Sequence, residues 1–579
     1  MNRLRRILLC VVLALLLAVA WFLWSRPKRV DMAAYAPANT LLYLETNEPL
    51  AVVQAIVETD AWKLMDKNSE AGWTGQGNRW LRRFIETTGI GPVHTVVLSR
   101  AQIAIVVTDL GTIEEGDTLT IKPEIALIIE THTSESRIRS PAEQALKKLA
   151  ESTYDNPTLR RTLINGVEFV EWRSQGGSRQ IVAAIVGSLL VVGNSETAVQ
   201  RCLDSAARRS PSLKDDANLQ RLRRELAGNR NLTFGYVPQE KSAHLLSVAV
   251  PLILGRAPGD AGFQKIVSTG ASKLLGSISW SSQPFKNGIE DRYLISLQPS
   301  FLRQLRPALS PIRSSDGDRR ILPEDTYSAS YYRFQDPVGA WEGLRTAVSS
   351  NIDALSAVVF SSLLKSALRS YGINEPDAFL RAVKGEILTL RVDQNGEHTL
   401  VIGGVKDRPA MRGLITKSMK FELESKPADH DGEELFADAQ GEMGVSLRND
   451  IIIMGTLSDV RRYSEKVNKN DATEGEEQFR RMTFFAPLSD SSPIVTYTAD
   501  SDRVRNFISV IMAAGGSPPK EPANFEQRLT QLPYAATETK LVDQGFQRTT
   551  RSPLGHFSTL LPLLMPSDRR PTATSPTSR

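Results

Sequence analysis

The chain has 579 residues, of which 41% are apolar and 23% charged, so it is long enough for two or more globular domains. Its formal net charge is +5, yet the first 29 residues hold six basic residues and no acidic residue. The rest has 64 basic against 65 acidic residues, which argues against a concentrated basic surface, and no nucleic-acid partner is expected.

The first predicted element is a transmembrane helix at residues 7–24. This segment, ILLCVVLALLLAVAWFLW, carries no charge, and its length approaches the ~20 apolar residues that span a bilayer. A cleaved signal peptide is the alternative, because Ala18-Val19-Ala20 has the small-x-small form. Cleavage there would leave the bulky WFLW at the new N-terminus, so we predict an uncleaved signal anchor.

The orientation of this anchor follows from its short basic start. We predict that residues 1–6 lie in the cytoplasm and that the body lies outside it, on a single-pass protein of the bacterial inner (cytoplasmic) membrane. Three basic residues flank each side of the apolar run, so the positive-inside rule does not decide the orientation by itself.

After the anchor, two similar segments occur, each with a proline, small or polar residues and a threonine before a β-prone run. We call these segments the two openings. Residues 35–48 read YAPANTLLYLETNE, and residues 320–333 read RILPEDTYSASYYR. A helix is predicted after each opening, starting near Pro49 in the first copy and near Pro337 in the second. Asn47 and Asp336 precede these prolines as the predicted N-caps.

Strands and further helices follow in the same order in both copies. The segments VGSLLVVGNSETAVQR and RNDIIIMGTLSDVRRY each predict an apolar strand, a glycine and a capped helix. Asn395-Gly396 predicts a tight hairpin between two antiparallel strands. Ser140-Pro141-Ala142-Glu143 has the form of a capping box, and Asp407 with Pro409 is its counterpart.

These patterns predict an α+β protein made of two tandem related units after the transmembrane helix. Each unit is expected to have a mostly antiparallel sheet with helices packed on one face. The expected bounds are residues 31–305 and 319–558, joined by a linker at 306–318 and followed by a disordered tail at 565–579. Short strand-turn patterns also match by accident, but six matches in one order argue against accident.

This layout resembles a bacterial, membrane-anchored family known as family 3352 of the domains of unknown function. The resemblance implies membrane attachment and carries over no catalytic residue. The sequence departs from the family pattern at Ala101-Gln102, where Gly-Glu is usual, and at Tyr327-Ser328, where the family is more apolar. The matching segments are Pro37 to Tyr43, Gly89-Ile90, Ala101 to Ile105 and Leu189 to Gly193, and then Pro323 to Tyr327, Gly372-Ile373, Gly385 to Leu388 and Ile451 to Gly455.

Motifs for metal, nucleotide or cofactor binding are not found. No two of the six histidines lie within thirty residues of each other, so no local metal-ligand motif exists and no metal or cofactor is predicted. Cys202 lies in an amphipathic helical pattern and is expected to be packed. The acidic run Asp429, Asp431, Glu433 and Glu434 does not form an EF-hand loop, because its glycine is at the fourth position instead of the sixth.

One motif matches a known chemistry. Ser362 and Lys365 have the Ser-x-x-Lys spacing of penicillin-interacting enzymes, which on a helix places the lysine one turn from the serine as a base. The partner motifs of those enzymes are missing, so an exposed helix surface is the preferred interpretation. We predict a non-enzymatic interaction or ligand-binding protein of the cell envelope, whose partner the sequence does not identify. An envelope hydrolase using this pair is the alternative, and a lipid or polymer carrier would need an apolar groove.

Overall fold

The structure is a computed structural model of the 579-residue chain. The predicted transmembrane segment at 7–24, the tail at 565–579 and part of the linker lie outside the residues that it describes. Within those residues, no helix combines the length and the apolar character needed to span a membrane. The described residues are 28–66, 100–115, 118–177, 179–228, 230–253, 261–312, 322–323, 325–369, 373–425, 433–448, 450–469, 472–485, 492–514 and 525–564.

The described strands form a large antiparallel sheet of 20 strands with helices, which confirms the α+β class. The prediction of two tandem units, each with its own sheet, is wrong, because strands of both predicted units join in one sheet. Strand β10 (Gly288–Leu297), from the first predicted unit, pairs antiparallel with β20 (Gly545–Ser552), from the second. The register runs without a break from Ile289 opposite Ser552 to Ser296 opposite Gly545. Each strand ends a hairpin, and pairing the two satisfies backbone groups that would otherwise lie at open edges.

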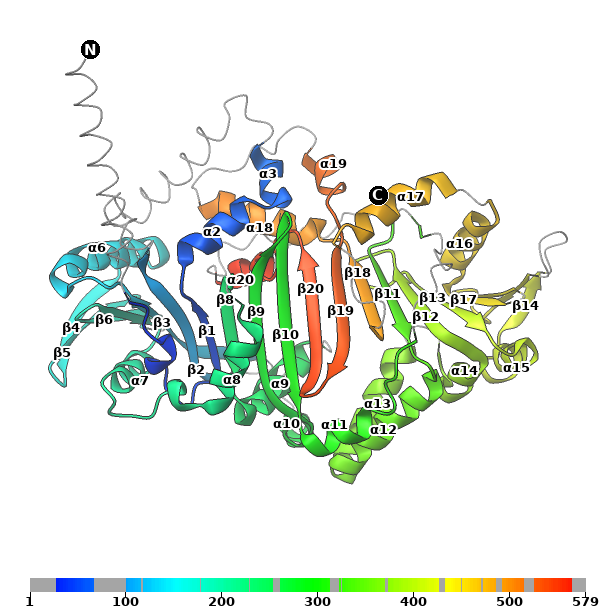
Figure 1. The fold of residues 1–579 in the computed structure, drawn as a ribbon, viewed down its shortest axis with the longest axis horizontal. Coiled ribbons are helices and arrows are strands. Elements are labelled where there is room, and N and C mark those ends of the chain that lie inside the picture. Colours follow the sequence, from blue (N-terminus) through cyan, green and yellow to red (C-terminus); the bar gives the residue numbers. More distant parts are fainter. Residues whose placement is uncertain are drawn as a thin grey trace, which may run out of the picture. The chain divides into compact units, whose positions relative to one another are not determined.

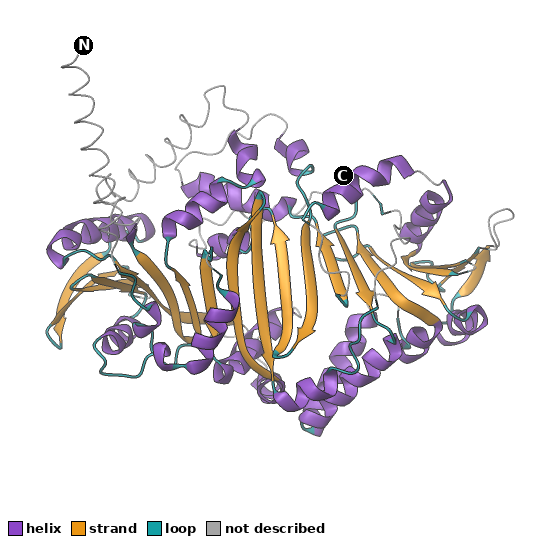
Figure 2. Ribbon diagram, in the orientation of Figure 1, coloured by secondary structure: helices purple, strands orange, loops and turns teal. Residues whose placement is uncertain are grey.

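The chain divides into two compact units at other positions. The first comprises Met1–Gln54, Arg79–Gly111 and Pro123–Arg221, and the second comprises Ala55–Asn78, Thr112–Lys122 and Leu222–Arg579. Each unit mixes helices and strands, as Figure 2 shows by colour. The division falls within two helices, α2 (Pro49–Val57) and α8 (Ala217–Leu226), and within two strands, β2 (Gln102–Glu115) and β3 (Thr118–Glu130).

The first unit has a sheet with the strand order β4-β5-β6-β7-β3-β2-β1. Helices α6 and α7 lie on opposite sides of the part formed by β4 to β7 (Figure 1). Alternate residues of β6 are buried on both faces, so the prediction of helices on one face is wrong here. The elements are η1 (Met32–Ala34), β1 (Leu42–Thr46), β2 (Gln102–Glu115), β3 (Thr118–Glu130), α6 (Glu135–Thr153), β4 (Thr158–Ile164), β5 (Val167–Arg173), β6 (Gln180–Val186), β7 (Leu189–Gly193), α7 (Glu196–Ala206) and η2 (Leu213–Asp215).

The second unit carries thirteen of the described strands, in the order β8-β9-β10-β20-β19-β18-β11-β12-β13-β17-β16-β15-β14. Its run β11-β12-β13-β17-β16-β15-β14 has the same connectivity as β1-β2-β3-β7-β6-β5-β4 in the first unit. A core that includes Phe379, Phe436 and Ile452 lies beneath it.

The strands of the second unit are β8 (Thr233–Val237), β9 (Leu275–Phe285), β10, β11 (Ser328–Arg333), β12 (Val383–Arg391), β13 (Thr399–Val405), β14 (Glu422–Ser425), β15 (Glu434–Ala437), β16 (Met443–Leu447), β17 (Ile451–Thr456), β18 (Ile494–Thr498), β19 (Ala535–Val542) and β20. Its helices are α3 (Asp60–Asp66), α9 (Gln239–Ile253), α10 (Ala261–Leu274), α11 (Pro299–Leu305), α12 (Pro337–Asn351), α13 (Ala354–Arg369), α14 (Pro376–Ala382), α15 (Arg408–Gly413), η3 (Leu414–Ser418), α16 (Leu457–Lys469), α17 (Ala472–Thr483), α18 (Ser501–Ala514), α19 (Phe525–Leu529) and α20 (Phe557–Leu564).

The two openings form the same local turn. The hydroxyl of Thr40 donates to the carbonyl of Pro37 at 2.6 Å, and Thr326 donates to Pro323 at 2.6 Å. Both threonines are buried, and each turn leads into a strand, β1 or β11. A buried hydroxyl that bonds the backbone three residues earlier closes the turn before the strand begins.

Three predicted helix starts are confirmed. Helix α2 begins at Pro49, α12 begins at Pro337 after the N-cap Asp336, and α15 follows Asp407. The Asp407 side chain accepts a hydrogen bond from the Ala410 backbone N–H at 2.9 Å, as an N-cap should.

Two predictions made from local sequence signals, a helix start and a tight turn, are wrong. The helix expected to start at the capping box of Ser140 begins earlier, after Ser134, so that Pro141 lies inside α6. The connection from β12 to β13 is antiparallel as predicted, but Arg391 pairs with Thr399, so Asn395-Gly396 sits in a longer loop. The Asp393 side chain holds that loop by accepting from two backbone N–H groups, which competes with a two-residue turn.

Candidate functional site

The predicted serine–lysine pair lies on α13. Ser362 is exposed on this helix, and the side chain of Lys365 is outside the described part of the structure. Ser362 does not line the cavity described below. The pair therefore stays a sequence prediction.

The acidic run at residues 429–434 and Cys202 are the other candidates from the sequence, and their described side chains do not share a site. Glu433 accepts from the Ser446 hydroxyl at 2.5 Å, whereas Glu434 accepts from Arg412 at 3.0 Å, and Asp429 and Asp431 lie outside the described residues. Cys202 is buried, and burial raises the pKa of its thiol to about 12. Across the described ranges, no group of three or more His, Cys, Asp and Glu side chains is arranged to hold a metal ion.

A cavity of about 550 Å³ lies in the first unit, between α6 and the β4–β5 hairpin. Trp172 is almost fully buried and belongs to the apolar cluster beneath α6, whereas Leu159 is 55% exposed. The lining combines this apolar surface with hydroxyl, amide and charged groups. It consists of Ser136, Arg139, Ser140, Glu143, Gln144, Lys147, Leu159, Arg161, Glu168 and Trp172.

Local sequence places the charged groups of this cavity. Glu135, Arg139 and Glu143 are spaced by four along α6 and therefore share one face of the helix. Asn165 and Gly166 have φ angles of 50° and 80°, which form a two-residue turn with both central residues left-handed. This turn brings Arg161 on β4 and Glu168 on β5 to the same face of the hairpin.

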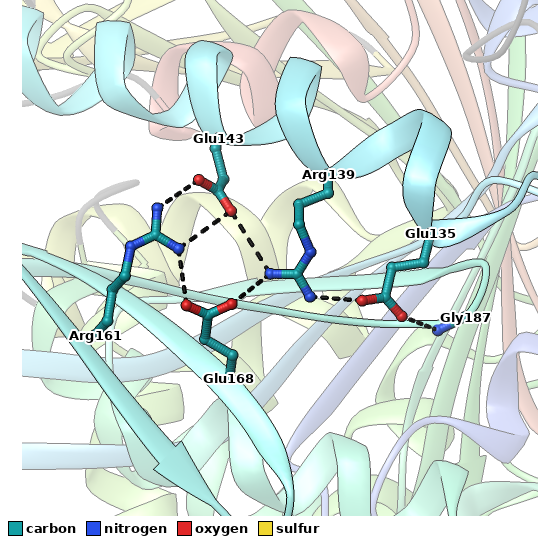
Figure 3. Close-up of polar contacts among 6 residues, drawn as sticks. All are labelled: Glu135, Arg139, Glu143, Arg161, Glu168 and Gly187. Atoms are coloured by element: carbon teal, nitrogen blue, oxygen red, sulfur yellow. Dashed lines mark hydrogen bonds and ion pairs between the residues drawn. The ribbon is translucent and has the colours of Figure 1, made fainter.

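The five charged side chains form a connected network (Figure 3). Arg139 donates to Glu135 at 2.5 Å and to Glu168 at 2.6 Å. Arg161 donates to Glu143 at 2.7 Å and to the other oxygen of Glu168 at 2.8 Å. Glu168 therefore bridges two guanidinium groups, and the network holds three carboxylates against two arginines.

Hydrogen bonds shift the ionisation of this network. The Arg139 guanidinium and then the Gly187 backbone N–H hold the pKa of Glu135 below its ordinary value. The hydrogen bond from Arg161 similarly lowers the pKa of Glu168. Because both pKa values are lowered by folding, the stabilisation is present above the ordinary value of 4.5 and is lost as the pH falls through the folded value.

We expect Glu168→Gln to lower the free energy of unfolding at pH 7 by only about 0.5–1 kcal/mol, since the pair groups are about one-third exposed and screened by water. The loss should shrink at pH 3, where more of the wild-type carboxylates are protonated than at pH 7. Urea denaturation at the two pH values measures this. Glu151→Gln is the matched control, because Glu151 meets Lys147 at 3.8 Å with both side chains more than half exposed. An equal loss at both pH values would show that the effect is not electrostatic.

The cavity has the chemistry of a binding site. The described residues that line it include no histidine or cysteine, and its two arginines are paired with carboxylates. Ser136, Ser140 and Gln144 remain as neutral hydrogen-bonding groups beside the apolar surface of Leu159 and Trp172. An apolar floor with a few placed polar groups is typical of sites that recognise a ligand.

A buried cluster in the second unit has the residue types of a catalytic triad. His556 Nδ1 lies 2.9 Å from Asp291, and the Ser282 hydroxyl donates to the same carboxylate. Ser282 is 0% exposed and Asp291 is 2% exposed, so a substrate has no access to this hydroxyl in the structure. The cluster joins β9 and β10 to the segment before α20, and we assign it a structural role.

The cavity is not predicted from the sequence, although two of its features have a local sequence signal. The Asn165-Gly166 pair between two β-prone runs indicates a hairpin, and the Glu-Arg-Glu spacing of 135, 139 and 143 indicates a charged helix face. What the sequence does not show is that α6 packs across this particular hairpin.

Comparison with known proteins adds little to these observations. No family model and no curated protein matches the chain. Crystal form IV of TP0453 matches with a TM-score of 0.24 at 11% identity, covering 50% of this chain and 90% of that one. Crystal form III gives 0.23 at 11% identity, with 50% and 91% covered. The substrate-free duplicated taurocyamine kinase from Schistosoma mansoni gives 0.13 at 9% identity, with 92% and 84% covered. TM-scores this low carry no argument about fold or function.

Proposed function

We propose that the protein is a membrane-anchored, extracytoplasmic binding module of the bacterial cell envelope that acts without catalysis. The cavity between α6 and the β4–β5 hairpin carries this proposal, because it combines an apolar floor with a charged network and neutral polar groups. The uncharged run at residues 7–24 supports the anchor, and the resemblance to family 3352 supports membrane attachment. The envelope hydrolase based on Ser362 and Lys365 is the competing proposal.

Photo-cross-linking in living cells tests the binding module. A photoreactive amino acid replaces Ser140, which lines the cavity, in the full-length chain. We expect a reproducible adduct in the membrane fraction, because a bound ligand would lie within reach of this position. The matched control places the same amino acid at Ser152, an exposed residue later on the same helix.

Several outcomes would contradict the proposal. Absence of an adduct from Ser140, or an equal yield from Ser152, would remove the cavity as the binding site. An inactive alkaline phosphatase fusion after residue 40 would place the body in the cytoplasm. A serine-reactive fluorophosphonate that labels the wild type but not Ser362→Ala would favour the hydrolase.

A further inference from the structure

Strand β4 is an open edge of the first unit's sheet. Among the described residues, β5 is the only strand that pairs with it, through seven consecutive residue pairs without a bulge. The strand at the corresponding place in the second unit, β14, has four residues and a register shift between Leu423 and Ser425. Proteins commonly blunt exposed edges by shortening or bulging them, and β4 has neither protection.

The hairpin geometry shows which backbone groups of β4 are free. In a two-residue hairpin, the residues beside the turn, here Ile164 and Val167, exchange both hydrogen bonds, and every second pair along the ladder does the same. The backbone N–H and C=O groups of Leu159, Arg161 and Leu163 therefore point away from β5. They form a row of donors and acceptors at which another strand could pair.

The side chains of the same three residues face α6. Leu159 lies opposite Trp172, which is packed beneath α6, and the face alternates regularly along the strand. Leu159 and Leu163 are 55% and 73% exposed, and Leu149 on α6 is 50% exposed. A strand added at this edge would place alternate side chains against these leucines, beside the cavity.

The opposite face of β4 carries a free positive charge. Arg160 is exposed and makes no hydrogen bond or ion pair with any described residue. Its neighbour across the strand pair, Glu171, is bound by Arg173 at 2.6 Å instead. An acidic side chain on an added strand would complement Arg160.

We propose that β4 binds an extended segment of another envelope protein, with alternating apolar and acidic residues, as an additional antiparallel strand. The inference rests on the proposed function and names the class of partner for the same site. A second copy of β4 is disfavoured as the occupant, because full antiparallel overlap of residues 158–164 places Arg161 opposite Arg161. Strand addition uses the backbone for affinity and alternate side chains for specificity.

The test uses an acetylated, amidated heptapeptide, Val-Glu-Val-Glu-Val-Glu-Val, and the full-length protein in detergent. In the proposed complex, the valines face α6, and three of the four lie opposite Leu159, Arg161 and Leu163, so that their N–H groups bond β4. N-methylation of the valines should abolish saturable binding in fluorescence anisotropy. N-methylation of the glutamates should leave it within about threefold, because those N–H groups point to solvent.

The second measurement compares the peptide affinity of protein variants in which the charge of one arginine is reversed. Arg160→Glu should weaken the peptide about tenfold and strengthen a Val-Lys analogue. Arg208→Glu, another exposed arginine of the first unit, should change neither. Equal effects of the two N-methylated peptides, or no binding of the parent peptide, would overturn strand addition. A Ser140 adduct obtained alongside that result would leave the proposed function standing. Self-association that Arg160→Glu abolishes would assign the edge to a second copy instead and would also overturn the proposal.

Discussion

Replacing Asp291 by alanine is expected to lower the free energy of unfolding by about 3–5 kcal/mol, the cost of removing one partner from a buried, hydrogen-bonded cluster. The carboxylate accepts from the His556 backbone N–H at 2.8 Å and from the Ser282 hydroxyl, and it lies 2.9 Å from His556 Nδ1. Both donors lose this partner, and the Ser282 hydroxyl does so in a fully buried position. The two residues lie on β10 and just before α20, so the C-terminal segment should loosen first.

Urea denaturation and hydrogen exchange measure this effect. Asp543→Ala is the matched control, because Asp543 is 93% exposed and pairs with Arg306 at the surface. We expect the control to change stability by no more than about 0.5 kcal/mol. A loss below about 1 kcal/mol for Asp291→Ala would show that the cluster does not hold the C-terminal segment in place.

Substitution of Asp500 is expected to have the second large effect. It should raise the free energy of unfolding at pH 7, whereas Asp291→Ala lowers it. Asp500 is 2% exposed, and one of its carboxylate oxygens makes no hydrogen bond to a described residue. Burial raises the pKa of Asp500 to about 6 from an ordinary value of 3.8, with Arg503 opposing the shift. The folded protein therefore holds this proton more tightly than the unfolded chain does.

The pH dependence follows from that difference. Below pH 3.8 the carboxyl is protonated in both states and carries no penalty. As the pH rises towards 6, the unfolded chain ionises first and stability falls, by about 3 kcal/mol once the folded carboxyl is also ionised. We expect Asp500→Asn to be more stable than the wild type by about that amount at pH 7 and equal to it near pH 3.

Asparagine preserves the position of Asp500 before α18, because it caps helices as well as aspartate does. Denaturation of both proteins from pH 3 to pH 8 measures the effect. Asp502→Asn serves as the control, since Asp502 is about one-third exposed and paired with Arg505. A wild-type stability that does not fall between pH 4 and pH 7 relative to Asp500→Asn would contradict the assignment.

Local signals predicted the parts of the fold that depend on a few neighbouring residues. Thr326 and Pro323 form the same hydroxyl–carbonyl turn as Thr40 and Pro37, and Asp407 caps its helix as expected. The signal at Ser140-Pro141 did not mark the helix start, because α6 begins after Ser134, six residues earlier. Proline then removes only one backbone hydrogen bond, a loss that packing of the helix over β5 and β6 can offset.

Long-range pairing is the part that the sequence could not show. No local sequence pattern predicts that β10 pairs with β20, because either strand could equally be the edge strand of a sheet. The cavity also depends on contacts between segments that are distant in the sequence. Its helix charges and its hairpin turn are visible at residues 135–143 and 165–166, whereas the bridge from Glu168 to both arginines depends on tertiary packing.

The β10–β20 pairing also affects how the protein is made. The paired residues lie about 250 positions apart. At a synthesis rate of about 5–20 residues per second, β10 is complete about 13–50 s before β20 exists. During that interval the nascent chain presents an unsatisfied strand edge, the kind of surface that promotes misassembly between chains. Factors that hold unfolded chains should therefore be needed until residue 552 has emerged, and a chain truncated before β20 should aggregate through β10.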